Sequence, residues 1–316
     1  MSERVDADAL ADRSSRTVAP PRLFRRRYLL PFLLVLPILL YEGLLIVYPI
    51  IQGIYGSFTR IELASSAATI WVGWANYERM FSDPAFWKVI RTTLLFTALV
   101  IVVALTIGLL TALLFNRPFR FRPVARGMLM MPWAIPEVPV VMIFIWILSP
   151  QFGVVNILAR MLPGVTKNPQ WLQVPELAMG WMVLISSWKA FPFYSLVILA
   201  ALQAIPQELY ESARVDGANR LQLFWNITFP GIGSTLELLV VLAAIFSFKQ
   251  FTIIFLMTGG GPSGTTETIV IRIFNTAFRF YDYSYATALG VAGFVVSLAV
   301  ALVFILMQVR RTQESA

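Results

Sequence analysis

The chain has 316 residues, of which 58% are hydrophobic and 13% are charged, and its formal net charge is +8. A soluble domain is about a quarter charged, so this composition indicates a membrane protein. The absence of Cys and His excludes disulfides, thiolate catalysis and metal sites built from either residue. Because the basic residues accompany long apolar runs, they favour membrane topology over nucleic-acid binding.

Residues 1–28 are polar and end in a basic cluster that includes Arg25, Arg26 and Arg27. The apolar run that follows is too long for the hydrophobic region of a cleaved signal peptide. Residues 1–28 are therefore predicted to form a retained, disordered cytoplasmic tail.

Six apolar stretches reach the roughly 20 residues that a membrane-spanning helix requires. They are residues 29–54, 92–115, 128–148, 177–202, 235–257 and 286–308. Several contain proline, which a helix bundle tolerates where neighbouring groups or water satisfy the freed carbonyls. The sequence thus predicts an all-α membrane protein with six transmembrane helices, some of them kinked around a cavity.

Lys and Arg are more frequent in the loops on the N-terminal side of the membrane, including Arg117, Arg120, Arg122 and Arg126. The positive-inside rule then places both termini and the loop 203–234 in the cytoplasm. The expected organisation is a first helix with its outer loop (29–91), a core of five helices (92–308) and a short C-terminal tail (309–316).

The loop after the fourth span is an unusually polar segment. Pro206 can open a short helix there, because its missing N–H costs nothing at the first turn. Gly217 can adopt the left-handed conformation that ends a helix, and a second short helix is expected from about Arg220 toward Pro230. This predicted helix-turn-helix either rests on lipid headgroups or docks a partner protein.

The same segment resembles the cytoplasmic EAA loop of ABC importer permeases. The stretch ESARVDGANRLQLFWNITFP starts at Glu211, with Ser212 at a position where the family usually has Ala. The residues that match the pattern are Glu211, Ser212, Ala213, Asp216, Gly217, Ala218, Ile227 and Pro230. The resemblance implies that this coupling loop, residues 204–230, forms the coupling helix that inserts into a groove on a separate ATP-hydrolysing subunit.

Further stretches resemble the sugar-importer branch of that family and occur in the family order. They are WVGWANYERMFSDPAFWKVIRTTLLFT (71–97), MPWAIPEVP (131–139), GVVNILA (153–159), LAALQAIPQELYESARVDGA (199–218) and SFKQFTIIFLMTGGGPSGTTET (247–268). The resemblance covers about residues 30–308. It implies the type I ABC importer transmembrane domain in its plain six-span form.

The resemblance implies a permease subunit for a carbohydrate, expected to be a di- or oligosaccharide, in a bacterial or archaeal plasma membrane. The implied partners are a second homologous permease, two ATP-binding subunits and an extracytoplasmic substrate-binding protein, besides membrane lipid. No nucleic acid is expected. Glycerol-3-phosphate or a related polyol is the alternative substrate, and an ion-coupled secondary carrier is the alternative from another class.

The chain contains no G-x-x-x-x-G-K-[ST] phosphate loop, so a partner subunit is expected to use ATP and Mg. No catalytic residue, metal site or cofactor is expected on this chain. A membrane-embedded enzyme is the least favoured alternative, because the sequence offers no catalytic constellation.

Charged side chains inside spans are candidates for function, because burying them in lipid is costly. Glu42 and Glu237 are assigned no role. The family resemblance implies that the helix of Glu42 is peripheral, and Glu237 lies within reach of headgroups. Glu137, Lys189 and Lys249 are expected to face an aqueous cavity, with Glu137 near one of the lysines. The alternative is a structural ion pair that holds two helices together.

Aromatic residues surround the lysine in the fourth span. Trp188, Phe191 and Tyr194 are candidates for the substrate pathway together with Lys189, because sugars are held by aromatic faces and hydrogen-bonding side chains. Each aromatic residue taken alone is more often a packing residue.

Overall fold

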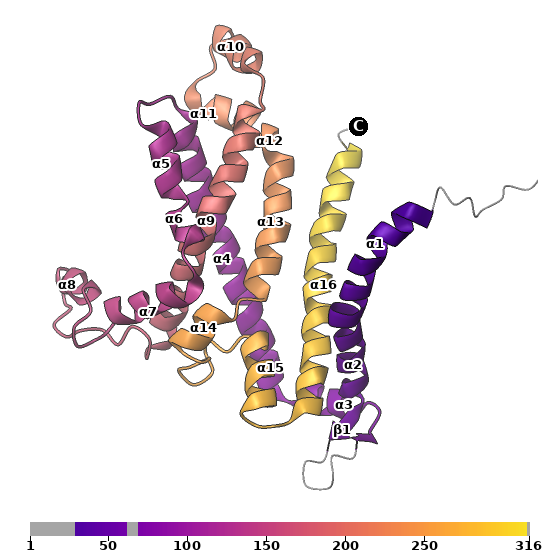
Figure 1. Cartoon of the computed structure of the whole chain (residues 1–316). Helices are drawn as coiled ribbons and strands as arrows, with labels where there is room; N and C mark the ends of the chain where they lie inside the picture. Colours follow the sequence, from indigo (N-terminus) through magenta and orange to yellow (C-terminus); the bar gives the residue numbers. More distant parts are fainter. Residues whose placement is uncertain (1–28, 62–68, 315–316) are drawn as a thin grey trace, which may run out of the picture. The chain divides into compact units, whose positions relative to one another are not determined.

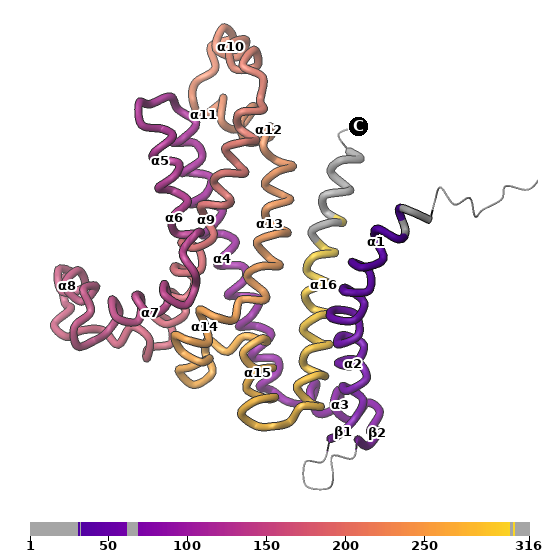
Figure 2. Tube along the Cα trace, viewed as in Figure 1, coloured from indigo at the N-terminus to yellow at the C-terminus, as the bar shows by residue number. Residues whose placement is uncertain are grey.

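The computed structural model describes residues 29–61 and 69–314, which are mostly helical (Figure 1). The predicted tail, residues 1–28, lies outside the described part of the chain. The chain divides after Gln52 into two compact units. In the second unit, the backbone trace shows helices α4, α9 and α13 running alongside one another (Figure 2).

The described residues of the first unit, 29–52, contain most of the first predicted span, and the end of its helix belongs to the second unit. Helix α1 (Leu29–Glu42) continues through a π-helical segment (Gly43–Val47) into α2 (Tyr48–Ser57), so the helical path runs without interruption. Its part from Leu33 to Ser57 is long and apolar enough to cross a membrane. The prolines in this span therefore do not break it.

Both π-helical segments of the described chain end two residues before a proline. Gly43–Val47 precedes Pro49, and Phe224–Thr228 precedes Pro230. Proline has no N–H to donate to the carbonyl four residues earlier. The wider turn shifts the local hydrogen-bond pattern by one residue, so that the helix continues past the proline.

The second unit contains the rest of the described chain. A short antiparallel pair of strands precedes the helices, with Thr59 opposite Trp71. The elements and their bounds are β1 (Thr59–Ile61), β2 (Thr69–Trp71), α3 (Ala75–Ser82), α4 (Pro84–Asn116), α5 (Arg122–Leu129), α6 (Met131–Ala134), α7 (Glu137–Ile147), α8 (Val155–Arg160), α9 (Pro175–Gln203), α10 (Gln207–Val215), α11 (Arg220–Leu223), the π-helical segment η5 (Phe224–Thr228), α12 (Phe229–Gly231), α13 (Gly233–Phe248), α14 (Thr252–Met257), α15 (Ile269–Phe278) and α16 (Tyr283–Glu314).

The packing of α4 against α9 forms the centre of this unit. Helix α4 begins at Pro84, where the Asp83 carboxylate caps it by accepting from the Ala85 N–H at 2.8 Å. Buried small residues recur every four positions along α4, at Ala104, Gly108 and Ala112. Such a stripe lets two helices approach closely. A Cβ at Gly108 would lie 3.2 Å from the Cβ of Tyr194 on α9.

Four of the predicted spans are continuous helices in this unit or in the first. The second, fourth and sixth correspond to α4, α9 and α16, and α4 begins eight residues before the predicted position 92. Helix α16 continues to Glu314, so the predicted tail from residue 309 is helical as far as that residue. The fifth span contains α13 and α14, which are separated at Lys249, Gln250 and Phe251.

The third predicted span, 128–148, is not one continuous helix. The segments Arg122–Ala134 and Glu137–Ile147 meet at an angle of 88°. Ile135 (φ −70°, ψ 132°) and Pro136 (φ −55°, ψ 146°) are extended, because proline disfavours helical geometry in the residue before it and cannot continue the hydrogen-bond ladder. The described chain therefore has five helices that could cross a membrane, or six if the bent pair is one span.

Long-range polar contacts join the elements at the end of the bundle opposite α10 (Figure 1). Arg79 on α3 pairs with Asp282 at 2.7 Å. Lys88 on α4 donates to the carbonyl of Ser263 at 2.8 Å, and Thr93 Oγ1 accepts from the N–H of Ile269 at 2.8 Å. These contacts connect α3 and α4 to segments near the C-terminus.

Candidate functional site

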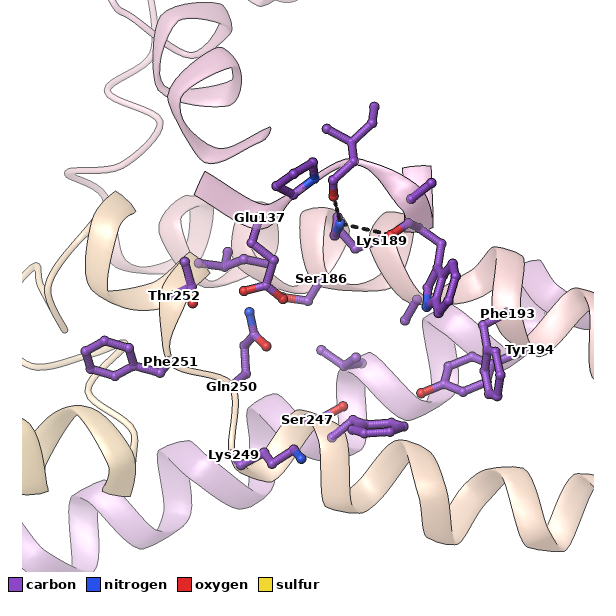
Figure 3. A pocket seen from close by; sticks show the side chains of 18 residues that line it. Glu137, Ser186, Lys189, Phe193, Tyr194, Ser247, Lys249, Gln250, Phe251 and Thr252 are labelled. Atoms are coloured by element: carbon purple, nitrogen blue, oxygen red, sulfur yellow. Dashed lines mark hydrogen bonds between the residues drawn. The ribbon is translucent and has the colours of Figure 1, made fainter. Parts of the chain in front are cut away.

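A cavity of about 630 Å³ lies between the broken third span and helices α4, α9 and α13. It combines charged, amide and hydroxyl side chains with aromatic rings (Figure 3). The residues that line it are Val100, Trp133, Ala134, Ile135, Pro136, Glu137, Ser186, Lys189, Ala190, Phe193, Tyr194, Phe246, Ser247, Lys249, Gln250, Phe251, Thr252 and Ile253. Two helix breaks, at Ile135–Pro136 and at Lys249–Phe251, supply part of this lining.

Lys189 lies on α9 opposite the first of these breaks. Its Nζ donates to the backbone carbonyl of Trp133 at 3.4 Å and, more closely, to the carbonyl of Ile135. Both carbonyls belong to the end of α6, where no following helical turn supplies an N–H. The ammonium group of Lys189 thus stabilises the break that Pro136 creates.

Glu137 begins α7 directly after the break, where the positive end of a helix dipole favours a carboxylate. Together with Lys189 and Lys249, it lines the same cavity. Within the described residues, Glu137 makes no ion pair with Lys189 at 4.0 Å or less. Figure 3 places its carboxylate beside Ser186 and Gln250.

Two polar groups of this cavity have no hydrogen-bond partner in the described part of the chain. They are the Ser186 hydroxyl and the Gln250 amide nitrogen. Buried polar groups normally find partners, and an unsatisfied one costs about 1–3 kcal/mol. Together with Glu137, these groups can donate to and accept from a polar solute.

Lys249 follows the last residue of α13 and caps it with its backbone N–H. Its position at a helix end explains how a charged residue occurs inside a predicted span. Its Nζ lies 4.9 Å from the centre of the Phe246 ring, a cation–π contact that leaves the ammonium group exposed to the cavity.

Aromatic residues form the other part of the lining. Trp133 and Phe193 stack with their ring centres 6.2 Å apart, and Phe193 contacts Tyr194 edge to face. Trp188 and Phe191, which the sequence suggested for the pathway, do not line the cavity. Trp188 packs instead against Phe144 in the core.

The sequence reasoning missed several lining residues, among them Trp133, Phe246 and Gln250. The signal for Trp133 was its place in MPWAIPEVP, where closely spaced prolines predict a break. Gln250 directly follows Lys249, but no proline or glycine marks the gap between α13 and α14.

The second candidate site is the segment from α10 to α12, at one end of the bundle (Figure 1). Gly217 has φ +84°, the left-handed conformation that ends a helix. The Ala218 N–H donates to the Ala213 carbonyl at 2.9 Å, and the Gly217 N–H donates to the Arg214 carbonyl at 3.1 Å. This pair of bonds is the Schellman motif, so α10 ends at the predicted turn.

The next helix, α11, begins with a capping box. The Asn219 side chain accepts from the N–H groups of Leu221 and Gln222, and the Gln222 side chain accepts from the Asn219 N–H at 2.8 Å. The hydroxyls of Tyr210 and Thr228 lie 3.1 Å apart and connect α10 to η5. The predicted helix-turn-helix is therefore present, except that Pro206 caps α10 rather than beginning it.

The eight residues that match the EAA pattern are distributed along this segment. Glu211, Ser212, Asp216, Gly217 and Pro230 are exposed, whereas Ala213, Ala218 and Ile227 are half-buried. Large apolar side chains are exposed on the same segment, including Val215 (88%), Leu221 (67%) and Trp225 (55%). Exposed apolar groups of this kind mark a surface for a protein or membrane contact.

The bundle of long apolar helices, the polar cavity at its helix breaks and the exposed helix-turn-helix define the membrane-embedded subunit of a transporter. The chain belongs to the family described as the binding-protein-dependent transport system inner membrane component, which matches residues 104–312. It is the permease component of an ABC transporter, and separate subunits hydrolyse ATP.

Relatives match along most of the chain. The sulfoquinovosyl glycerol transport system permease protein SmoG of Agrobacterium fabrum is 36% identical over 90% of this chain and 92% of its own length. The trehalose/maltose transport system permease protein MalF of Thermococcus litoralis is 32% identical over 90% of this chain and 95% of its own length. A crystal structure of a bacterial ABC transporter that imports the acidic polysaccharide alginate has a TM-score of 0.77, with 28% identity over 90% of this chain and 96% of that one.

Proposed function

We propose that this chain imports a carbohydrate and that the 630 Å³ cavity is its part of the substrate pathway. The observation that carries the proposal is the composition of the cavity. The unpartnered groups of Ser186 and Gln250 and the carboxylate of Glu137 lie in the same cavity as the stacked rings of Trp133 and Phe193. Hydroxyl-rich solutes are bound by such polar groups combined with aromatic faces.

The names of similar proteins support the same substrate class. They transport sulfoquinovosyl glycerol, trehalose and maltose, and alginate. A glycerol-3-phosphate permease, UgpA of Brucella abortus, is 33% identical over 79% of this chain, so glycerol-3-phosphate or a related polyol stays the alternative substrate. A di- or oligosaccharide is favoured, because the cavity is larger than one small polyol requires.

The assembly follows from the proposed function. A second permease subunit, two ATP-binding subunits and an extracytoplasmic binding protein would complete the importer, with ATP and Mg held by the ATP-binding subunits. A related alginate transporter was crystallised with its substrate-bound periplasmic protein, which supports the last of these partners. We place the complex in a bacterial or archaeal inner membrane with both chain termini in the cytoplasm, as the distribution of Lys and Arg favours.

The segment from α10 to α12 is proposed as the contact with the ATP-binding subunit. Its exposed apolar side chains and its rigid turn at Gly217 suit insertion into a groove. A cysteine introduced at Glu211 or Ala218 should crosslink to a cysteine-bearing ATP-binding subunit, and the background is clean because the chain has no native Cys. A cysteine at Lys167, in the loop after α8, is the control. Failure of both sites to crosslink in every nucleotide state would reject this contact.

The substrate is best identified through the purified importer in liposomes. Ligands released from the binding protein, analysed by mass spectrometry, supply the candidate sugars, and uptake of each is measured with and without ATP. Uptake that depends on ATP and falls at least tenfold in a Gln250→Leu/Ser186→Ala variant supports the cavity. Uptake driven by an ion gradient alone would contradict the proposed function.

Charge reversal tests whether Glu137 and Lys189 act as a pair. The single variants Glu137→Lys and Lys189→Glu are compared with the double variant in the same uptake assay. Recovery in the double variant supports a paired role in the cavity. Complete loss in both single variants without recovery in the double variant argues against it.

A further inference from the structure

The loop between α4 and α6 carries a concentrated positive charge. Four arginines, Arg117, Arg120, Arg122 and Arg126, lie close together in sequence, and no Asp or Glu occurs between Pro84 and Pro136. Within residues 29–61 and 69–314, none of these arginines forms an ion pair. The cavity and the α10–α12 segment do not account for this charge.

Two of these arginines converge on one uncharged group. Arg122 and Arg126 are one helical turn apart on α5 and therefore share a face. With the amide of Gln203 oriented to satisfy both, its oxygen accepts from Arg122 Nη2 at 2.5 Å and from Arg126 Nη2 at 2.8 Å. Gln203 is the last residue of α9, so the two guanidinium groups meet at the negative end of that helix.

The donors of these guanidinium groups exceed the acceptors around them. The Nε–H groups of Arg122 and Arg126 are enclosed and have no partner in the described structure. One amide oxygen and a helix end cannot neutralise two full positive charges. A phosphate group, with negative charge and several acceptor oxygens, matches adjacent guanidinium groups in both charge and geometry.

The surroundings of the arginines favour a lipid as the source of the phosphate. Exposed apolar side chains, Phe119, Phe121, Val124 and Met128, lie on the same loop and helix. The loop directly follows α4, a helix apolar enough to cross a membrane. Basic residues beside a span attract anionic headgroups, while neighbouring apolar residues contact the acyl region.

We propose that Arg122 and Arg126 form a binding site for the headgroup of an anionic phospholipid, with Arg117 and Arg120 contributing to its field. The site lies at the end of α9 from which α10 continues after a short connection. A bound lipid there would hold α5 against the end of α9. The proposal is independent of the substrate that the transporter carries.

Native mass spectrometry of the assembled transporter tests this site. The complex in detergent is titrated with phosphatidylglycerol and with phosphatidylcholine, and inorganic phosphate is added as a competitor. In the variant Arg122→Gln/Arg126→Gln, phosphatidylglycerol affinity should fall about 30-fold, as expected from the loss of two charges near an anionic headgroup. The variant Arg122→Lys/Arg126→Lys keeps the charge but loses the paired guanidinium donors, so its affinity should fall between those of the wild type and the glutamine variant.

The matched control is Arg60→Gln/Arg160→Gln, which removes two exposed charges outside this loop and should leave the affinity unchanged. Equal affinity in the Arg122/Arg126 variant and the wild type would overturn the proposal, as would equal binding of phosphatidylcholine by the wild type. If inorganic phosphate displaced phosphatidylglycerol at concentrations similar to those at which the lipid itself binds, the site would be reassigned to free phosphate. Unchanged lipid affinity with loss of the ATP-binding subunit would assign the arginines to a protein contact instead.

Discussion

Replacement of Lys189 by Met would remove the group that stabilises the bend in the third span. Met keeps the length and straight shape of the lysine stem but cannot donate to the carbonyls of Trp133 and Ile135. We expect the assembled transporter to lose thermal stability, because both carbonyls then lack a protein partner at the break before Glu137.

The size of the loss follows from the two bonds and from the exposure of the site. A hydrogen bond from a charged group contributes about 1.5–3 kcal/mol, so two contribute about 3–6 kcal/mol. Lys189 is half-buried in an open cavity, and water can replace part of each bond. A net loss of about 1–3 kcal/mol is expected, which corresponds to a fall in the unfolding midpoint of roughly 2–8 °C.

Intrinsic tryptophan fluorescence during thermal unfolding in detergent measures this change, with Lys249→Met as the matched control. In the described structure, the one interaction of the Lys249 ammonium group is its contact with the Phe246 ring. Such a contact contributes about 0.5–1 kcal/mol when it is exposed. Lys249→Met should therefore lower the unfolding midpoint less than Lys189→Met does. Equal midpoints for the wild type and Lys189→Met would refute the stabilising role of this lysine.

Four further substitutions test local backbone features by thermal unfolding or hydrogen exchange. Gly217→Ala should destabilise the protein by about 1–2 kcal/mol, because φ is +84° at this position. Gly180→Ala lies in α9 with open space around it and should stabilise the protein by up to about 1 kcal/mol. Midpoint shifts of the same sign in the two variants would contradict this expectation. Asn219→Ala removes the cap of α11, costs about 1 kcal/mol and should speed amide exchange there, so unchanged protection would count against the capping box. Gly153→Ala places a methyl group against the carbonyls of Ile147 and Ser149, the second at 2.6 Å, and should lower the midpoint more than Gly217→Ala does.

Features determined by local residues could be predicted from the sequence. The turn after α10 depends on Gly217 and bonds within a few residues, and it lies where expected. The apolar stretches likewise locate α4, α9 and α16, since length and hydropathy decide which segments can cross a membrane. The observed helix ends differ from the predicted ones by several residues, because capping groups such as Asp83 lie outside the apolar stretch.

Features that depend on distant contacts could not be predicted. The prolines in MPWAIPEVP indicate a kink, but its angle of 88° involves the backbone of Pro136 and the side chain of Lys189, which lies on another helix. The same limit applies to the cavity. Trp188 and Gln250 both lie near a predicted charged position, but only the three-dimensional packing determines that Trp188 faces the core and Gln250 the cavity.

The two ends of the bundle differ in the sequence separation of the residues that are bonded there. Within the segment from α10 to α12, the turn is closed by bonds between near neighbours in sequence, such as that from the Ala218 N–H to the Ala213 carbonyl. At the opposite end, Arg79 pairs with Asp282 across 203 residues. Local contacts form faster than distant ones. During synthesis, the α10–α12 segment can thus acquire its shape as soon as it leaves the ribosome, whereas the pairing of Arg79 at the opposite end has to wait until Asp282, directly before α16, has been made.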